Sequence, residues 1–130
     1  MEFKQIKETC LYVQDLTRTK QFYTQKIGLP LIAEVPDRHV FFRVGTSVLL
    51  CFNPEKTRHS QELPPHFGAG QLHLAFECVP QEYEAWQAKL RQAQVTIEHE
   101  QTWPHGRRSF YFRDPDGHLL EIVMPGIWEK

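Results

Sequence analysis

The sequence predicts an α+β fold made of two βαβββ modules in tandem. The first observation behind this is that one order of strand and helix patterns occurs twice along the chain. The second is that a stretch rich in proline and glycine, at about 54–70, separates the two occurrences. The third is the length of 130 residues, which suits one domain with a packed core. We therefore expect one domain, with module one at about 1–53, a linker at about 54–70 and module two at about 71–130.

Module one is predicted to contain a strand, a helix and three further strands. Residues 5–13 end in β-branched and aromatic side chains, which is typical of a strand. Asp15 is a suitable N-cap for a helix over 16–26, and Gly28 suits its end. Short strands are expected near 31–35, 39–44 and 47–52, and the turn between the last two is expected at 45–47.

Module two is predicted to repeat this order after the linker. A strand is expected at 72–79, and Pro80 suits the start of a helix. Tyr83, Trp86 and Leu90 form an apolar stripe on a helix of about 81–93. Further strands are expected near 95–100, 108–113 and 118–124, with a tight turn at 114–117 between the last two.

Composition and charge exclude several classes of protein. The chain has 15 Lys and Arg against 16 Asp and Glu, a net charge of −1, so it has no general attraction for nucleic acid or for an anionic membrane. Apolar runs are too short for a transmembrane helix, and the first residues lack the apolar core of a signal peptide, so we expect a cytoplasmic protein. The three cysteines are expected to be reduced thiols.

The duplication also indicates a candidate site. Aligning the opening strands of the modules pairs Glu8 with His73, and aligning the closing strands pairs Cys51 with Glu121. Glu8, His73 and Glu121 carry side chains that bind divalent metals, and an unpaired carboxylate in the apolar run around Glu121 would be costly to bury. A metal site is therefore one interpretation. The alternatives are a solvent-facing Glu8, a hydrogen-bonded core His73 and a Glu121 on the wet face of a sheet.

Three segments resemble the vicinal oxygen chelate superfamily, which includes glyoxalases, fosfomycin-resistance enzymes, bleomycin-resistance proteins and extradiol dioxygenases. They are 11–16 leading into a helix, Phe22-Tyr23 followed by 27–29, and SFYFRDPDGHLLE at 109–121. The last is the most specific, and the resemblance covers nearly the whole chain. It implies that the two modules curl into a cup-shaped half-barrel around one divalent metal ion.

The resemblance also implies which residues bind the metal. The family's ligands come from the first strand of each module and from the last strand, and those positions hold Glu8, His73 and Glu121. Many members have histidine where this chain has Glu8. One imidazole with two carboxylates suits Mn, Fe, Ni, Co, Zn or Mg. A fourth protein ligand, usually a glutamate in glyoxalase I, would fall at Cys51, so the resemblance favours three-ligand relatives such as the fosfomycin-modifying enzymes.

Residues near the expected metal are predicted to contact the substrate. Tyr111 and Thr9 match positions close to the substrate in the fosfomycin enzymes, although strand alternation points Thr9 and Glu8 to opposite faces. Arg107 or Arg108 would bind a carboxylate or phosphonate, unless the two form a solvated turn. The predicted substrate-binding set is Thr9, Arg107, Arg108, Ser109 and Tyr111, and the predicted catalytic residues are Glu121 and Tyr111.

These observations predict a small metal-dependent enzyme. We expect a lyase, isomerase, or thiol or water transferase that chelates a small oxygenated anion. The alternatives are an extradiol-type dioxygenase and a metal-free protein that binds a drug or metabolite, as bleomycin-resistance proteins do. A homodimer is expected because the open edges and apolar faces of two half-barrels need a partner. In small family members a second chain commonly completes the site, and Glu8 of one protomer would then join His73 and Glu121 of the other.

Overall fold

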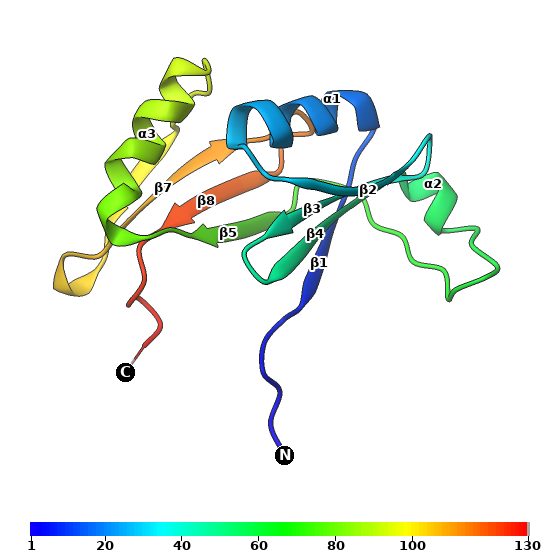
Figure 1. Ribbon diagram of the computed structural model, residues 1–130, viewed down its shortest axis with the longest axis horizontal. Helices are drawn as coiled ribbons and strands as arrows, with labels where there is room; N and C mark the ends of the chain where they lie inside the picture. Colours follow the sequence, from blue (N-terminus) through cyan, green and yellow to red (C-terminus); the bar gives the residue numbers. More distant parts are fainter. Residues whose placement is uncertain (130) are drawn as a thin grey trace. The chain divides into compact units, whose positions relative to one another are not determined.

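The protein contains two four-stranded mixed sheets, one in each half of the chain. The computed structural model describes residues 1–129 (Figure 1). Contacts divide the chain into two units, Met1–Gly70 and Gln71–Lys130. The strand order is β1-β4-β3-β2 in the first sheet and β5-β8-β7-β6 in the second. In each sheet the first and last strands of the unit are parallel neighbours, and the other pairs are antiparallel. The prediction of two βαβββ modules in an α+β fold is confirmed.

The first unit follows the expected order of elements. The Asp15 carboxylate accepts a hydrogen bond from the backbone N–H of Arg18 (3.0 Å), and Gly28 ends the helical segment with a φ of 91°. The predicted helix is an α-helix in its first half and a π-helix in its second. The elements are β1 (Glu8–Tyr12), α1 (Leu16–Gln21), η1 (Phe22–Ile27), β2 (Leu31–Val35), β3 (His39–Val44), β4 (Ser47–Phe52) and α2 (Pro54–Thr57).

The two faces of the first sheet have different surroundings. Because side chains alternate along a strand, Leu11, Phe42 and Leu49 share one face, where they are buried. The helical segment 16–27 covers that face in Figure 1, and its Tyr23 ring lies 5.3 Å from the Phe42 ring. The opposite face therefore belongs to the alternate residues of β1, β3 and β4, beginning with Glu8.

The linker folds back along the first sheet. It contains α2, which the sequence analysis did not predict, capped by the side chain of Asn53. The Tyr12 hydroxyl and His66 Nδ1 are 2.7 Å apart. A Cβ atom at Gly68 would lie only 2.5 Å from the Tyr12 ring, so glycine allows the backbone to approach β1 this closely.

The second unit repeats the architecture, with one predicted strand displaced. Its elements are β5 (His73–Glu77), η2 (Pro80–Glu82), α3 (Tyr83–Gln92), β6 (His99–Thr102), η3 (Pro104–Gly106), β7 (Arg108–Arg113) and β8 (Leu119–Val123). The prediction of a strand near 95–100 is wrong for its first residues. Val95 is instead a buried residue of the connection after α3, and the pairing with β7 begins at His99. In the described part of the chain, no helix has both the length and the apolar character to cross a bilayer.

Candidate active site

A histidine and a glutamate meet on neighbouring strands of the second sheet. His73 opens β5, Glu121 lies in the middle of β8, and His73 Nε2 is 3.4 Å from Glu121 Oε1. His73 Nδ1 is 2.8 Å from the carbonyl oxygen of Leu119. Because a carbonyl can only accept, Nδ1 carries a hydrogen, and Nε2 is the ring nitrogen that faces the carboxylate.

The environment of Glu121 leaves this carboxylate incompletely satisfied. Its side chain is 8% exposed, whereas that of His73 is 48% exposed. Among the described residues, no hydrogen-bond partner reaches the buried Oε2 of Glu121. A buried carboxylate oxygen without a partner is destabilising, and two lone pairs at 3.4 Å repel unless a proton or a metal cation lies between them. The donor set and its burial therefore fit a divalent cation.

Tyr111 stands beside this pair on the adjacent strand. It is the direct antiparallel partner of Glu121 in the β7–β8 ladder. Burial raises the pKa of the Tyr111 hydroxyl, and the Glu121 carboxylate raises it further, while a hydrogen bond with Ser109 acts in the opposite direction. Tyr111 is therefore protonated at neutral pH, and its hydroxyl can donate a hydrogen bond next to Glu121. The His99 ring follows on β6, 5.9 Å from the Tyr111 ring.

Other predicted substrate residues of the second unit have partners elsewhere. Arg108 donates to Glu84 (2.7 Å) and Glu100 (3.2 Å), and its guanidinium lies 4.6 Å from the centre of the Tyr83 ring, on the side of the sheet that α3 covers. Arg107 donates to the carbonyl of His105 and packs against Gly126.

Ser109 also has a local partner. It is fully buried, and its hydroxyl accepts a hydrogen bond from the indole N–H of Trp103 (2.9 Å). The structure thus brings together His73, Glu121 and Tyr111, and it engages Arg108 and Ser109 in contacts of their own.

Glu8 and Thr9 lie on β1 in the first unit. Both border a cavity of about 750 Å³ on the sheet face opposite α1. Neighbouring side chains of a strand point to opposite faces, and the two residues nevertheless both border the cavity. Over residues 1–129, neither unit by itself gathers three His, Cys, Asp or Glu side chains in an arrangement that could hold a metal.

The strand registers correct the internal alignment of the closing strands. Cys10 lies opposite Leu50 in the first sheet, and Ala75 lies opposite Glu121 in the second. Because Cys10 and Ala75 each stand two residues after the opening residue of their strand, Leu50 is the equivalent of Glu121. The pairing of Cys51 with Glu121 was wrong by one residue, and Cys51 is fully buried on the other face. The conclusion drawn from it survives, since leucine also supplies no fourth ligand.

Sequence analysis missed the remaining residues around the cavity of the first unit. They come from β3, β4 and the linker, which were read only as structural elements. The alternation of His39 with Phe41, and of Leu50 with Phe52, places these four side chains on one sheet face and could have indicated an aromatic surface. The cavity-lining residues beyond Glu8 and Thr9 are Cys10, Tyr12, Arg38, His39, Phe41, Leu50, Phe52, Ser60, Leu63, Pro64 and His66.

The fold and the His–Glu pair together define a class of protein built from two βαβββ units, with potential metal ligands on neighbouring strands of one sheet. Comparison with protein families agrees with this class. The chain belongs to the Glyoxalase/Bleomycin resistance protein/Dioxygenase superfamily, whose sequence profile matches residues 5–122. The resemblance recognised in the sequence is thereby confirmed.

Proteins similar to this chain include thiol transferases and a lyase. The glutathione transferase FosA of Serratia marcescens is 32% identical over 120 residues, which cover 90% of this chain and 78% of the relative. A metallothiol transferase FosB of Staphylococcus epidermidis is 27% identical over 123 residues, covering 94% of this chain and 82% of the relative. The crystal structure of lactoylglutathione lyase from Agrobacterium tumefaciens matches with a TM-score of 0.91 and 32% identity, and 98% of each chain is covered.

Proposed function

We propose that the protein is a metal-dependent enzyme of the lyase or transferase kind that chelates a small oxygenated anion. The observation that carries this proposal is the orientation of His73. Its Nδ1 is fixed by a backbone carbonyl, so its Nε2 faces the buried, incompletely satisfied Glu121 carboxylate and could bind a cation there as the neutral imidazole. Histidines that bind a metal through one ring nitrogen typically donate a hydrogen bond from the other nitrogen to a carbonyl or carboxylate, as His73 does here.

Glu8 is the proposed third protein ligand, alongside His73 and Glu121. One imidazole and two carboxylates suit a divalent ion of Mn, Fe, Ni, Co, Zn or Mg, and three protein ligands leave positions open for substrate oxygens. Such an ion would polarise the bound oxygens and stabilise negative charge on them. With two glutamates and a neutral histidine the protein ligands carry −2, which balances the charge of the ion.

Tyr111 is the proposed hydrogen-bond donor to the substrate. Its raised pKa keeps the hydroxyl protonated, and its place opposite Glu121 directs that hydroxyl at an oxygen bound beside the carboxylate. Thr9 and Arg107 stay proposed substrate contacts, Thr9 through its position next to Glu8. For Arg108 and Ser109, the ion pairs and the buried indole contact favour a role in holding β7 in place.

A homodimer is part of the proposal. β1 and β5, which carry Glu8 and His73, are both edge strands of their sheets. Edge strands can pair with a second copy of a chain, and Glu8 of one protomer is proposed to join His73 and Glu121 of its partner. Mixed dimers of Glu8→Ala and Glu121→Ala subunits would then regain metal sites that neither variant has alone. Sedimentation of only a 15.4 kDa species at micromolar concentration would contradict the dimer.

A thiol cosubstrate is proposed on the strength of the relatives. The similar proteins are named as glutathione and metallothiol transferases and as a lactoylglutathione lyase. We therefore propose that a small thiol adds to the metal-bound substrate, or that its adduct is rearranged there. Enzyme-dependent loss of free glutathione with fosfomycin would indicate transfer, whereas enzyme-dependent conversion of the hemithioacetal that glutathione forms with a 2-oxoaldehyde into a thioester would indicate lyase chemistry.

Metal content tests the central claim. Elemental analysis of the purified protein is expected to give about one divalent ion per chain, and His73→Ala and Glu121→Ala are expected to lose most of it. Full occupancy in either variant would refute the ligand assignment. Wild-type protein without bound metal, and without metal-dependent thiol transfer, would favour the binding-protein alternative. Metal-dependent oxygen uptake with a catechol would favour the dioxygenase.

A further inference from the structure

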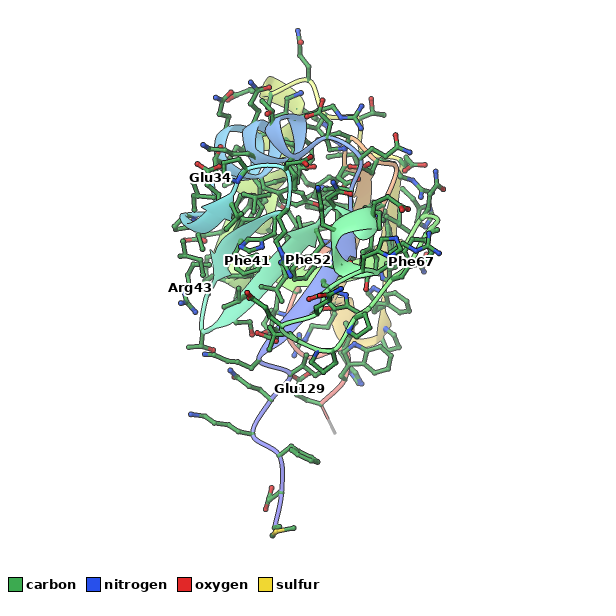
Figure 2. The ribbon with its side chains drawn as sticks, turned by 90° about the vertical axis from the view of Figure 1, so that its right-hand side faces the viewer. Glu34, Phe41, Arg43, Phe52, Phe67 and Glu129 are labelled. Carbon is green, nitrogen blue, oxygen red and sulfur yellow. The ribbon has the colours of Figure 1, made fainter. Side chains whose placement is uncertain are left out.

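The first unit contains a cavity that several ring side chains help to line, among them Phe41, Phe52 and His66. It has a volume of about 750 Å³, within the range of sites that bind drug-sized molecules. The face of β1, β3 and β4 opposite α1 forms one wall, and residues 60–66 of the linker contribute to the other. Figure 2 shows Phe41 and Phe52 on this sheet face, and their ring centroids are 5.4 Å apart. A molecule of only a few heavy atoms would leave most of this surface uncovered.

The rings are arranged to receive a flat group. His39 and Phe41 stack in parallel, with centroids 4.0 Å apart and planes 11° from each other. Phe52 meets both of them edge-on, at 5.9 Å and 5.4 Å. From the linker, the His66 ring lies 4.8 Å from Phe52. Stacked and edge-on ring pairs are favourable arrangements, and a further aromatic ring can extend such a cluster with the same geometry.

Arg38 supplies positive charge at this cavity. Its Nη1 donates to His39 Nδ1 (2.9 Å), and its guanidinium carbon lies 5.9 Å from the centre of the Phe52 ring. Burial lowers the pKa of His39, and the neighbouring Arg38 lowers it further, so the histidine is neutral and accepts this hydrogen bond. Within residues 1–129, Arg38 forms no ion pair, and the carboxylate bordering the same cavity is that of Glu8. The remaining guanidinium N–H groups can bind an anion.

We propose that this cavity binds a planar aromatic group that carries an acidic substituent, with the ring against Phe41 and Phe52 and the acid on Arg38. The inference rests on the proposed function in one respect. Glu8 borders this cavity and is also a proposed metal ligand, so the aromatic anion would be the substrate of the proposed enzyme. It moves the main anion contact from the Arg107–Arg108 turn to Arg38. It also describes a larger substrate than the small oxygenated anion expected from the sequence.

Three probes separate the contribution of the ring from that of the charge. Phenylphosphonate has both features, methylphosphonate has only the charge, and benzyl alcohol has only the ring. Titrations followed in ¹H–¹⁵N spectra of metal-free protein are expected to show phenylphosphonate binding at least tenfold more tightly than either of the others. The largest shifts are expected at the amides of residues that border the cavity, such as Tyr12, Phe41 and His66.

Substitutions then assign the two contacts. Arg38→Met is expected to weaken phenylphosphonate binding by about tenfold or more and to leave benzyl alcohol unaffected, since a charged hydrogen bond contributes on that scale. Phe41→Leu is expected to remove the preference for phenyl over methyl. Arg43→Met is the matched control, because Arg43 lies on the same strand and the same face as Phe41 but does not border the cavity. Dispersed amide spectra verify that each variant is folded.

The outcomes distinguish this inference from the proposed function. Equal binding of the two phosphonates, unchanged binding in Arg38→Met, or shifts confined to the second unit would each overturn the aryl-anion site. Because the titrations use metal-free protein, these results do not depend on Glu8, His73 or Glu121 holding a metal. Conversely, specific phenylphosphonate binding by a protein that takes up no metal would support the cavity and refute the proposed enzyme.

Discussion

Replacing Glu121 with glutamine should have opposite effects on the metal-free and the metal-loaded protein. In the metal-free state, the charged side chain is 8% exposed and one of its oxygens is buried without a partner in the described residues. Glutamine has nearly the same size and no charge. We therefore expect the unfolding free energy of metal-free Glu121→Gln to equal that of the wild type or exceed it by about 1 kcal/mol.

The metal-loaded state should reverse this order. A metal present at 100 times its dissociation constant stabilises the wild type by about 2.7 kcal/mol if it binds only the folded chain. For a chain of this length, that corresponds to a rise of roughly 10 °C in Tm. Glu121→Gln removes an anionic ligand and should gain less than roughly 3 °C under the same conditions.

Thermal unfolding with EDTA and with each candidate metal measures both effects. Glu77→Gln is the matched control, since Glu77 lies on the adjacent strand β5, on the same face as His73, and is exposed. It should behave like the wild type with and without metal. If metal-free Glu121→Gln were destabilised by more than about 1 kcal/mol, and metal stabilised it as much as the wild type, the carboxylate would be a structural partner of His73 and no ligand.

Three further predictions concern individual side chains. Tyr83→Phe should leave the unfolding free energy unchanged or raise it by up to about 1 kcal/mol in urea titrations, because the buried Tyr83 hydroxyl has no partner within residues 1–129. Arg108→Met should lower the unfolding free energy by about 1–2 kcal/mol, because it removes two ion pairs and a contact with the Tyr83 ring. Arg107 is exposed, so Arg107→Met should change the unfolding free energy by less than about 0.5 kcal/mol. Because the pKa of His39 is lowered in the folded protein, the unfolded chain binds a proton at this imidazole more readily than the folded chain does. The unfolding free energy should therefore fall as the pH drops below 6.5, and it should fall less steeply in His39→Gln.

Local patterns were sufficient to predict most elements of the fold. Asp15 and Gly28 delimit the first helical segment because capping and a positive φ depend on the residue itself. The strand over 95–100 was displaced because Val95 is apolar for a different reason, namely burial beside α3. A pattern of apolar residues indicates which residues are buried, but it does not indicate where a strand begins. Strand β6 begins at His99 because His99 is the first of its residues to pair with β7, opposite Tyr111.

The sequence was sufficient to predict only one part of the candidate site, namely the two residues His73 and Glu121, which occupy fixed positions in sequence patterns. The repeat indicated His73 and the motif at 109–121 indicated Glu121, and their 3.4 Å approach is a consequence of the parallel β5–β8 register. The partners of Arg108 were not predictable, because Glu84 and Glu100 come from a helix and a strand whose packing the local sequence does not encode. The one-residue error at Cys51 has a similar origin, since a shift of one residue exchanges the two faces of a strand.

The two sheets differ in chemistry along one row of cross-strand neighbours. In the first unit this row runs from Leu50 to Phe41. In the second, the equivalent neighbours are Glu121 and Tyr111. The backbone pairing is the same, but one row is apolar and the other combines a carboxylate with a hydroxyl. In the proposed enzyme, the metal and the developing negative charge would use the second row, and the apolar body of a substrate would use the first. A carboxylate at position 50 would border the same cavity as Arg38 and would compete with an anionic ligand for its guanidinium, whereas Leu50 keeps this row apolar beside Phe41.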